Sequence, residues 1–249
     1  MGLVGTTHNW TGAAGRRSPW PAAPCYTIQV TRSTALLDTL TRVPLIVMMF
    51  MVARAAWLRL GEHIAHLAQT GPAAFALAFG QDAAFCCFAL AVCALAVLRL
   101  PPVRKARGLL PRAAAMAGSF LLTLLAQLPR ATDLPPALGM ASLCLLLVGN
   151  TLTAFSVLHL GRSFSILPEA RRLVTSGPYA VVRHPLYVAE AAAAAGSFLM
   201  YLSWPAVALC ALQTLFQLAR VHYEEAVLRA TFPEYADYAR RVPRFLPRW

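Results

Sequence analysis

The chain has 249 residues, of which 58% are apolar and 13% are charged, and its mean hydropathy is +0.57. Soluble proteins carry roughly 25% charged residues, so this composition excludes an ordinary soluble domain and predicts helices that lie in lipid. The formal net charge of +12 allows a nucleic-acid partner unless the basic residues follow a membrane topology instead.

Residues 1–42 are polar and rich in Gly, Thr, Pro and Arg, and they lack the apolar core of a secretory signal. We therefore expect a disordered cytoplasmic tail. Six apolar runs follow, at residues 43–60, 72–98, 113–128, 136–160, 185–203 and 206–222. Residues 43–135 then hold three accessory transmembrane helices, and residues 136–249 hold a membrane core with a C-terminal cytoplasmic tail.

The positions of the basic residues decide between topology and nucleic-acid binding. Of the 22 Lys and Arg residues, 19 fall in alternate segments between the apolar runs and 3 in the others. This is the positive-inside pattern of an all-α polytopic membrane protein with six helices and both termini cytoplasmic. Because this topology accounts for most of the Lys and Arg residues, little positive charge is left for binding nucleic acid. A bacterial chain of this kind would lie in the inner membrane.

Two polar features of the first two predicted helices are weaker candidates for functional sites. Asp82 lies within the second apolar run and is a candidate functional residue, although Gly80 beside it is equally consistent with a kinked helix start. His63 and His66 have i, i+3 spacing but lack a third ligand nearby, so we predict no metal site.

The segment from Ser176 to Glu190 is the chemically densest part of the chain. Its Gly-Pro pair predicts a turn, and Pro185 fits the first position of a helix, where its missing N–H costs nothing. Arg183 and His184 would then lie at the positive end of that helix and form an anion site. Tyr187 and Glu190 share one helix face, and Glu190 is expected to face a pocket because a carboxylate is costly in lipid.

The fifth and sixth runs form a helical hairpin, because only a short turn at Trp204-Pro205 separates them. The start of one run and the end of the other therefore lie at the same depth, which brings Arg183 and His184 opposite Glu224 and Glu225. A ligand that bears both a carboxylate and a positive charge would suit this corner.

These residues also carry a family resemblance. The motifs are Leu160-Gly-Arg-Ser-Phe-Ser165, Val174-Thr-Ser-Gly-Pro-Tyr-Ala-Val-Val-Arg-His-Pro-Leu-Tyr187, Glu224-Glu225, Phe232-Pro-Glu-Tyr235-Ala-Asp-Tyr238 and Val242-Pro-Arg244. Together they resemble the isoprenylcysteine carboxyl methyltransferase family and its phospholipid methyltransferase relatives, over about residues 136–249. The chain departs from the family at Ala189, where Gly is usual, and the added methyl could shift the pose of the cofactor but need not abolish binding.

The resemblance implies S-adenosylmethionine as cofactor and no metal. His184, Pro185, Tyr187 and Tyr179 would line its site, and Glu224 and Glu225 would hold its amino or ribose end. Arg183, Glu224 and Tyr187 are the implied catalytic residues. Five residues would close a cytoplasmic lid over the implied site: Tyr179, Arg162, Tyr235, Tyr238 and Arg244.

The acceptor stays open at this stage, although membrane burial favours a lipid-like or small apolar molecule. A carboxylate acceptor needs no base, whereas an amine or thiol must lose a proton to Glu224, Glu225 or His184. Two other functions remain: a membrane NADPH-dependent sterol-type reductase, which shares the His-Pro-x-Tyr pattern, and a non-enzymatic haem-binding or accessory protein that uses His159, His184 or His222. The sequence makes no prediction of oligomeric state.

Overall fold

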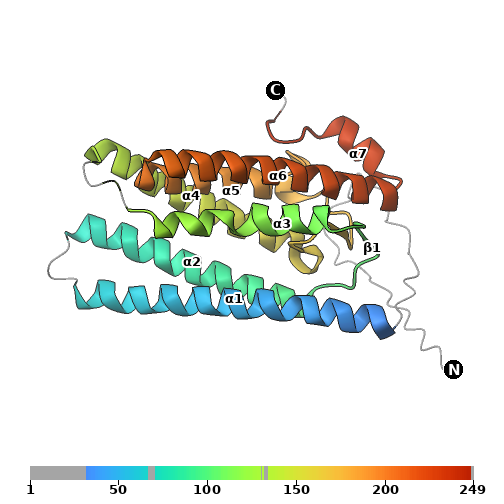
Figure 1. The fold of residues 1–249 in the computed structure, drawn as a ribbon, viewed down its shortest axis with the longest axis horizontal. Helices are drawn as coiled ribbons and strands as arrows, with labels where there is room; N and C mark the ends of the chain where they lie inside the picture. The colour runs from blue at the N-terminus through green and yellow to red at the C-terminus, as the bar shows by residue number, and fades with distance from the viewer. Residues whose placement is uncertain (1–31, 67–70, 130, 132–133, 248–249) are drawn as a thin grey trace.

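The computed structural model describes residues 32–66, 71–129, 131 and 134–247. The described residues are mostly helical, as expected (Figure 1). The helices are α1 (Arg32–Ala65), α2 (Pro72–Leu98), α3 (Leu110–Phe120), α4 (Pro136–Leu160), α5 (Pro185–Tyr201), α6 (Trp204–Thr231) and α7 (Tyr235–Arg241), with 3-10 turns η1 (Leu121–Gln127), η2 (Gly161–Ser163) and η3 (Gly177–Ala180). Two short strands, β1 (Arg104–Lys105) and β2 (Glu169–Ala170), pair antiparallel.

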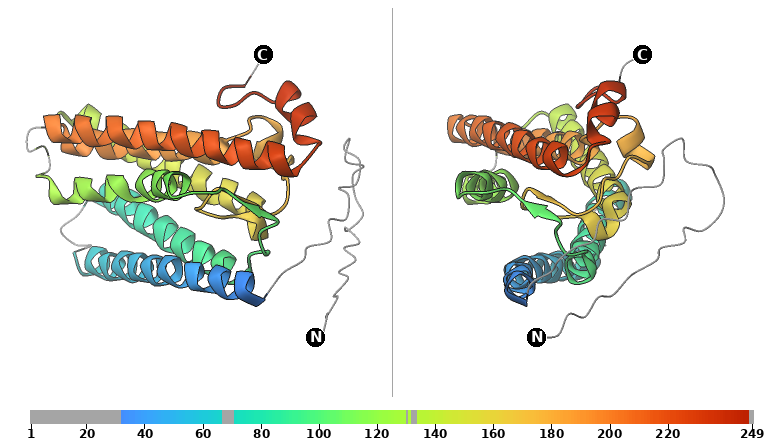
Figure 2. Two further views of the ribbon diagram at one scale, coloured as in Figure 1. Left: turned by 45° about the vertical axis from the view of Figure 1, so that its right-hand side comes forward. Right: turned by 90° about the vertical axis from the view of Figure 1, so that its right-hand side faces the viewer.

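The long helices run along the longest axis of the molecule, with α1 and α6 on opposite sides of the bundle (Figures 1 and 2). Between them, α4 packs against both α2 and α5. A core cluster joins the elements: Leu45, Val92, Ala96, Val157, Phe164 and Leu186. The α7 helix and β1 lie at one end of the bundle, where the loop between α4 and α5 also begins.

Small residues allow α4 and α5 to approach closely. A Cβ atom at Gly149 would lie 2.5 Å from the backbone nitrogen of Ala193, and one at Gly196 would lie 2.8 Å from the carbonyl oxygen of Ser142. The Ser142 hydroxyl also donates a hydrogen bond to the Gly196 carbonyl at 2.7 Å. Residues without bulky side chains are therefore required at this interface.

The boundaries differ from expectation at several points. The α1 helix begins at Arg32, inside the segment predicted as a disordered tail, and residues 1–31 lie outside the described residues. The third apolar run forms a short α3 that continues as the 3-10 turn η1. The α6 helix extends beyond the predicted residue 222 to Thr231, so Glu224 and Glu225 belong to it.

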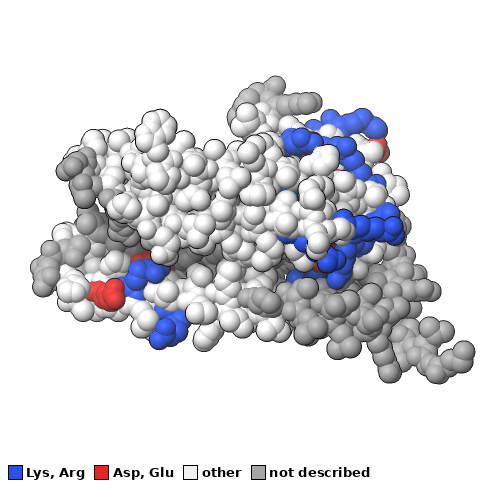
Figure 3. All heavy atoms as spheres, viewed as in Figure 1, with Lys and Arg blue, Asp and Glu red and all other residues white. Residues whose placement is uncertain are grey.

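The expectation of six membrane spans is not confirmed. Among the described residues, one helical stretch, Pro136–Ser163, is both long and apolar enough to cross a membrane, while Cys86–Leu98 and Leu110–Leu125 are shorter apolar stretches. Lys and Arg side chains nevertheless gather at the end that carries α7 and β1, and the middle of this face is almost free of charge (Figure 3).

Asp82, a candidate functional residue by its position, is engaged in an ion-pair cluster between α1 and α2. The Arg59 Nε donates to its Oδ1 at 2.9 Å, and the His63 Nε2 lies 3.0 Å from its Oδ2. The carboxylate therefore ties the two helices together. The described residues contain no group of three or more metal-ligating side chains at these or other positions.

Candidate active site

The start of α5 is organised as the sequence suggests, with His184 as the N-cap and Pro185 at the first helical position. Two backbone N–H groups at this helix start, however, are used by the chain itself. The Arg183 N–H donates to the Pro243 carbonyl at 2.8 Å, and the His184 N–H donates to the Arg244 carbonyl at 3.1 Å. The C-terminal segment thus covers this helix end, and the predicted anion site does not present these two N–H groups to a ligand.

The anion at this site is Glu225 of α6. Its carboxylate lies within 3.3 Å of four basic groups: Arg183 (3.3 Å), His184 (3.1 Å), Arg229 (3.2 Å) and Arg244 (2.7 Å). The side chain of Glu225 is 3% exposed. Such a buried carboxylate is tolerated because its lone pairs are filled by charged donors.

The network keeps Glu225 ionised. Burial alone would raise the pKa of Glu225, but the hydrogen bonds from His184 and Arg244, together with the charge of Arg183, lower this pKa well below its ordinary value. At Arg244 the hydrogen bond to Glu225 raises the pKa of the guanidinium and outweighs burial, which would lower this pKa. Glu225 is therefore a fixed negative charge that positions Arg183 and His184.

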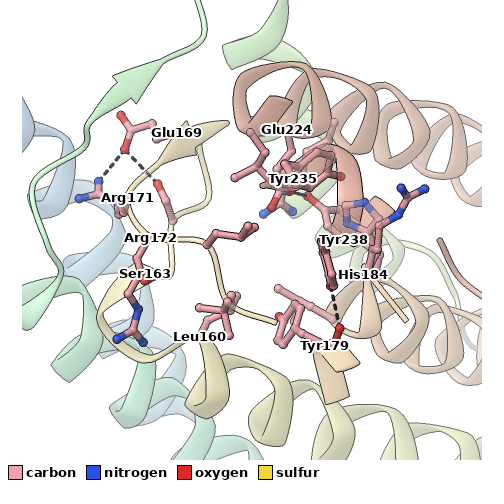
Figure 4. Close-up of a pocket in the computed structure, with 18 of the residues that line it drawn as sticks. Leu160, Ser163, Glu169, Arg171, Arg172, Tyr179, His184, Glu224, Tyr235 and Tyr238 are labelled. Carbon is pink, nitrogen blue, oxygen red and sulfur yellow. Dashed lines mark hydrogen bonds and ion pairs between the residues drawn. The ribbon is translucent and has the colours of Figure 1, made fainter. Parts of the chain in front are cut away.

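A cleft lies beside this network. It encloses about 740 Å³, including its open mouth. Figure 4 shows two walls that face each other across open space. One wall carries Tyr179, His184, Glu224, Tyr235 and Tyr238, and the other carries Leu160, Ser163, Glu169, Arg171 and Arg172.

The second wall is held in place by the strand pair. Glu169 of β2 accepts hydrogen bonds from the Arg171 guanidinium at 2.5 Å and the Ser165 hydroxyl at 3.2 Å, and Lys105 of β1 lies 3.5 Å from it. The Val103 N–H also donates to the Ala170 carbonyl at 2.8 Å. These contacts fix the connector after α4 against the loop after α2.

Three hydroxyl groups that line the cleft lack a hydrogen-bond partner among the described residues, those of Tyr179, Tyr235 and Ser163. Tyr179 is 6% exposed and Tyr235 is 1% exposed. Buried polar groups are normally satisfied, so these hydroxyls mark a place for a polar ligand. Burial raises the pKa of Tyr179 and of Tyr235, and both remain hydrogen-bond donors at neutral pH.

At the inner end of the cleft, the Tyr187 hydroxyl donates to Glu224 Oε2 at 2.6 Å. The Arg220 guanidinium lies 5.0 Å from the centre of the Tyr187 ring, in the range of a cation–π contact. Its Nη1 also donates to the Ser119 hydroxyl of α3 at 3.1 Å. Opposite charges from α6 thus bracket the ring of Tyr187.

The structure brings together most of the residues predicted for the site. Arg183, His184, Tyr187, Tyr179 and Glu224 line the cleft, as do the predicted lid residues Tyr235 and Tyr238. The predicted residues that do not line it are Pro185, Glu225, Arg162 and Arg244.

Each residue outside the cleft has an observed structural contact. Pro185 starts α5, Glu225 and Arg244 pair with each other, and Arg162 donates to the Leu98 carbonyl at 2.6 Å. Ala189 is 1% exposed and its carbonyl faces Gly149 of α4. Its added methyl therefore does not line the cleft.

Sequence reasoning missed Ser163, Glu169, Arg171, Arg172 and Arg220 as parts of this cleft. The adjacent arginines of the connector were visible as a charged pair, but nothing local places them opposite Tyr235. Arg220 lies one helical turn before Glu224, so the i, i+4 rule was the available signal for it.

Comparisons with known proteins agree with the residues of this site. Residues 138–235 match the phospholipid methyltransferase family. The chain is 33% identical over 112 residues to protein-S-isoprenylcysteine O-methyltransferase B of Arabidopsis thaliana, which covers 42% of this chain and 57% of that protein. It is 46% identical over 77 residues to the cobalt-zinc-cadmium resistance protein CzcN of Cupriavidus metallidurans, covering 30% of this chain and 36% of that protein.

A third relative is the nickel-cobalt-cadmium resistance protein NccN of Alcaligenes xylosoxydans, with 42% identity over 81 residues, 32% of this chain and 38% of that protein. In each case the match spans less than two thirds of the relative. The resemblance to isoprenylcysteine and phospholipid methyltransferases that the motifs predict is confirmed.

Proposed function

We propose that this chain transfers a methyl group from S-adenosylmethionine to a lipid-like or small apolar acceptor at the cytoplasmic face of a membrane. The observation that supports the proposal is which part of the chain forms the cleft. Of the residues that line it, only Tyr238 lies outside the segment that matches the phospholipid methyltransferase family. The matched segment and the cleft are thus one feature of the chain.

The residues of the cleft fit this cofactor. The unpartnered hydroxyls of Tyr179, Tyr235 and Ser163 suit its ribose and adenine, and the exposed Arg172 suits its carboxylate. Glu224 keeps Oε1 available beside its bond to Tyr187 and suits the amino group. When bound, the cofactor supplies an activated methyl group, and the protein contributes orientation and exclusion of water.

A membrane position is part of the proposal. The exposed surface of the long helices carries large apolar side chains such as Phe50, Trp57, Phe155 and Leu215, which are costly in water but not in lipid. The basic end with α7 and β1 (Figure 3) would then face the cytoplasm, in accordance with the charge distribution along the chain. The cleft lies at this end, where a soluble cofactor can enter.

The test is calorimetric binding of S-adenosylmethionine, and separately of NADPH, to the full chain in detergent. We expect the sulfonium cofactor to bind and its affinity to fall in Glu224→Gln, while Asp237→Asn at the exposed surface of α7 leaves it unchanged. Binding of NADPH instead would move the assignment to the reductases. A haem absorbance band in the purified protein, with neither cofactor bound, would favour the non-enzymatic reading.

A further inference from the structure

The segment that joins β1 to α3, residues 103–112, carries four basic residues, and two of them are bound within the chain. The Arg104 guanidinium donates to the Ala230 carbonyl of α6, and Lys105 Nζ lies 3.5 Å from a carboxylate oxygen of Glu169 in β2. Both residues belong to β1, which pairs with β2. These two cations therefore hold the segment against the bundle.

The other two basic residues of this segment, Arg107 and Arg112, are exposed. Among the residues that the structure describes, neither guanidinium forms a hydrogen bond or an ion pair. An arginine without a partner inside the chain keeps its N–H donors and its charge for a molecule outside it. The segment thus offers two cations to an external anion.

Two leucines lie between these arginines in the sequence. Leu109 is 79% exposed and Leu110 is 73% exposed. Gly108 has a φ of +94°, in the left-handed region that favours glycine, and it turns the chain from β1 into α3. The turn leaves two adjacent leucines with little packing at the start of the helix. We call residues 107–112 the α3 tip.

The exposed face of α3 combines cationic and apolar side chains. Leu109, Arg112 and Met116 are spaced three and four residues apart, so they share a face, and all three are exposed. The opposite face packs on α6 and carries small buried residues: Pro111, Ala114, Ala115 and Gly118. The helix is thus fixed to the bundle by one face and turns charge and apolar surface outward with the other.

The α3 tip lies where cytoplasm and lipid would meet. Directly before it, β1 is at the end of the bundle where Lys and Arg side chains gather (Figure 3). In the membrane position proposed above, this end faces the cytoplasm, where anionic head groups attract basic residues. Exposed leucines beside cations are typical of segments that lie in the membrane interface. A free anion or a nucleic acid would bind the arginines but leave the leucines in water, whereas a lipid satisfies both.

From this arrangement we infer that the α3 tip docks on anionic phospholipids of the cytoplasmic leaflet. Arg107 and Arg112 bind the head groups, and Leu109 and Leu110 lie among the first carbons of the acyl chains. The inference rests on the membrane position within the proposed function, but it is independent of methyl transfer. The tip lies outside the segment that matches the family, and none of its residues lines the cleft.

The probe is a matched pair of lipids, dioleoylphosphatidylglycerol and dioleoylphosphatidylcholine, which share their acyl chains and differ in net head-group charge. Each is titrated into the full chain in detergent, and bound lipid is counted by native mass spectrometry. We expect tighter binding of the anionic lipid. Arg107→Gln combined with Arg112→Gln should weaken that binding about fivefold for each arginine removed. Denaturant unfolding should not change, because both side chains are exposed and without partners among the described residues.

Two controls match these changes elsewhere on the surface. Arg240→Gln combined with Arg241→Gln removes the same charge from exposed positions of α7 at the same end of the bundle, and should have only a slight effect on the anionic lipid. Leu109→Ser combined with Leu110→Ser should weaken binding of this lipid, because the tip then loses its apolar contact. Leu246→Ser, at a side chain that is 77% exposed, should leave the binding unchanged.

The outcomes separate this inference from the proposed function. Equal affinity for the two lipids, or equal losses in the arginine variants of α7 and of the α3 tip, would show that the tip is not a docking site for anionic lipid. Displacement of the lipid by millimolar inorganic phosphate would show that the arginines recognise a free anion instead. If the chain does not insert into vesicles of phosphatidylcholine alone, the membrane position in the proposed function itself fails.

Discussion

The sharpest prediction concerns Glu225→Gln. The substitution keeps the size of the side chain but removes the charge that four basic groups share within 3.3 Å. Because the carboxylate is 3% exposed, its loss leaves buried cations unpaired, and we expect the free energy of unfolding to fall by about 3–5 kcal/mol.

Arg229→Gln is the matched control. Arg229 contacts the same carboxylate at 3.2 Å, but its side chain is 56% exposed, so removing it should cost no more than about 1 kcal/mol. Both values come from chemical-denaturant unfolding of the full chain in detergent micelles. Equal losses in the two variants would refute the idea that burial makes Glu225 the centre of the network.

The same variant separates a structural from a binding role. Glu225 does not line the cleft, whereas Arg183 and His184, which it holds, do. We therefore expect Glu225→Gln to weaken S-adenosylmethionine binding under conditions in which the protein is still folded, and Arg229→Gln to leave it nearly unchanged. Unchanged affinity in folded Glu225→Gln would mean that the network does not position the site.

Three further predictions use other contacts. Tyr187→Phe removes the 2.6 Å hydrogen bond to Glu224 and should lower cofactor affinity about tenfold, since hydrogen bonds to charged groups contribute about 1.5–3 kcal/mol; calorimetry measures it. Gly149→Ala should destabilise the fold by about 1–3 kcal/mol through overpacking. At Gly61 an added Cβ atom would meet nothing within 4 Å, so Gly61→Ala should stabilise its helix by up to about 1 kcal/mol. Denaturant unfolding compares the two variants. The pKa of Glu225 is lowered on folding. Its contribution to the free energy of unfolding is therefore full above the ordinary Glu pKa of about 4.3 and is lost as the pH falls below that value. Acid titration should thus destabilise the unmodified chain more steeply than Glu225→Gln.

Helix positions and the site motif were largely accessible from the sequence. Pro136 and Pro185 begin α4 and α5 at the predicted residues, because proline at the first helical position needs no N–H partner. The close approach of α4 to α5, which depends on Gly149 and Gly196, was not predicted.

The boundaries that failed were those set by tertiary contacts. The apolar run of α6 ends near residue 222, but the helix continues to Thr231 because its polar end packs on α7 and β2. Val227 of this helix end belongs to one buried cluster with Phe232, Tyr235 and Ala170. Hydropathy measures the preference of a segment for lipid or water. It does not predict a polar helix end that is stabilised by packing against other parts of the same chain.

By itself, the sequence determined that the chain is helical, that most of its Lys and Arg residues fall in alternate segments between the apolar runs, and that Arg183 and His184 lie opposite the Glu224-Glu225 pair. These features are local or follow from a short hairpin, so periodicity and spacing contain them. Only the tertiary structure decided the different orientations of Glu224 and Glu225. Adjacent residues on an α-helix point about 100° apart, so Glu224 faces the cleft while Glu225 turns into the buried cluster of Arg183, His184 and Arg244, and no motif records that rotation.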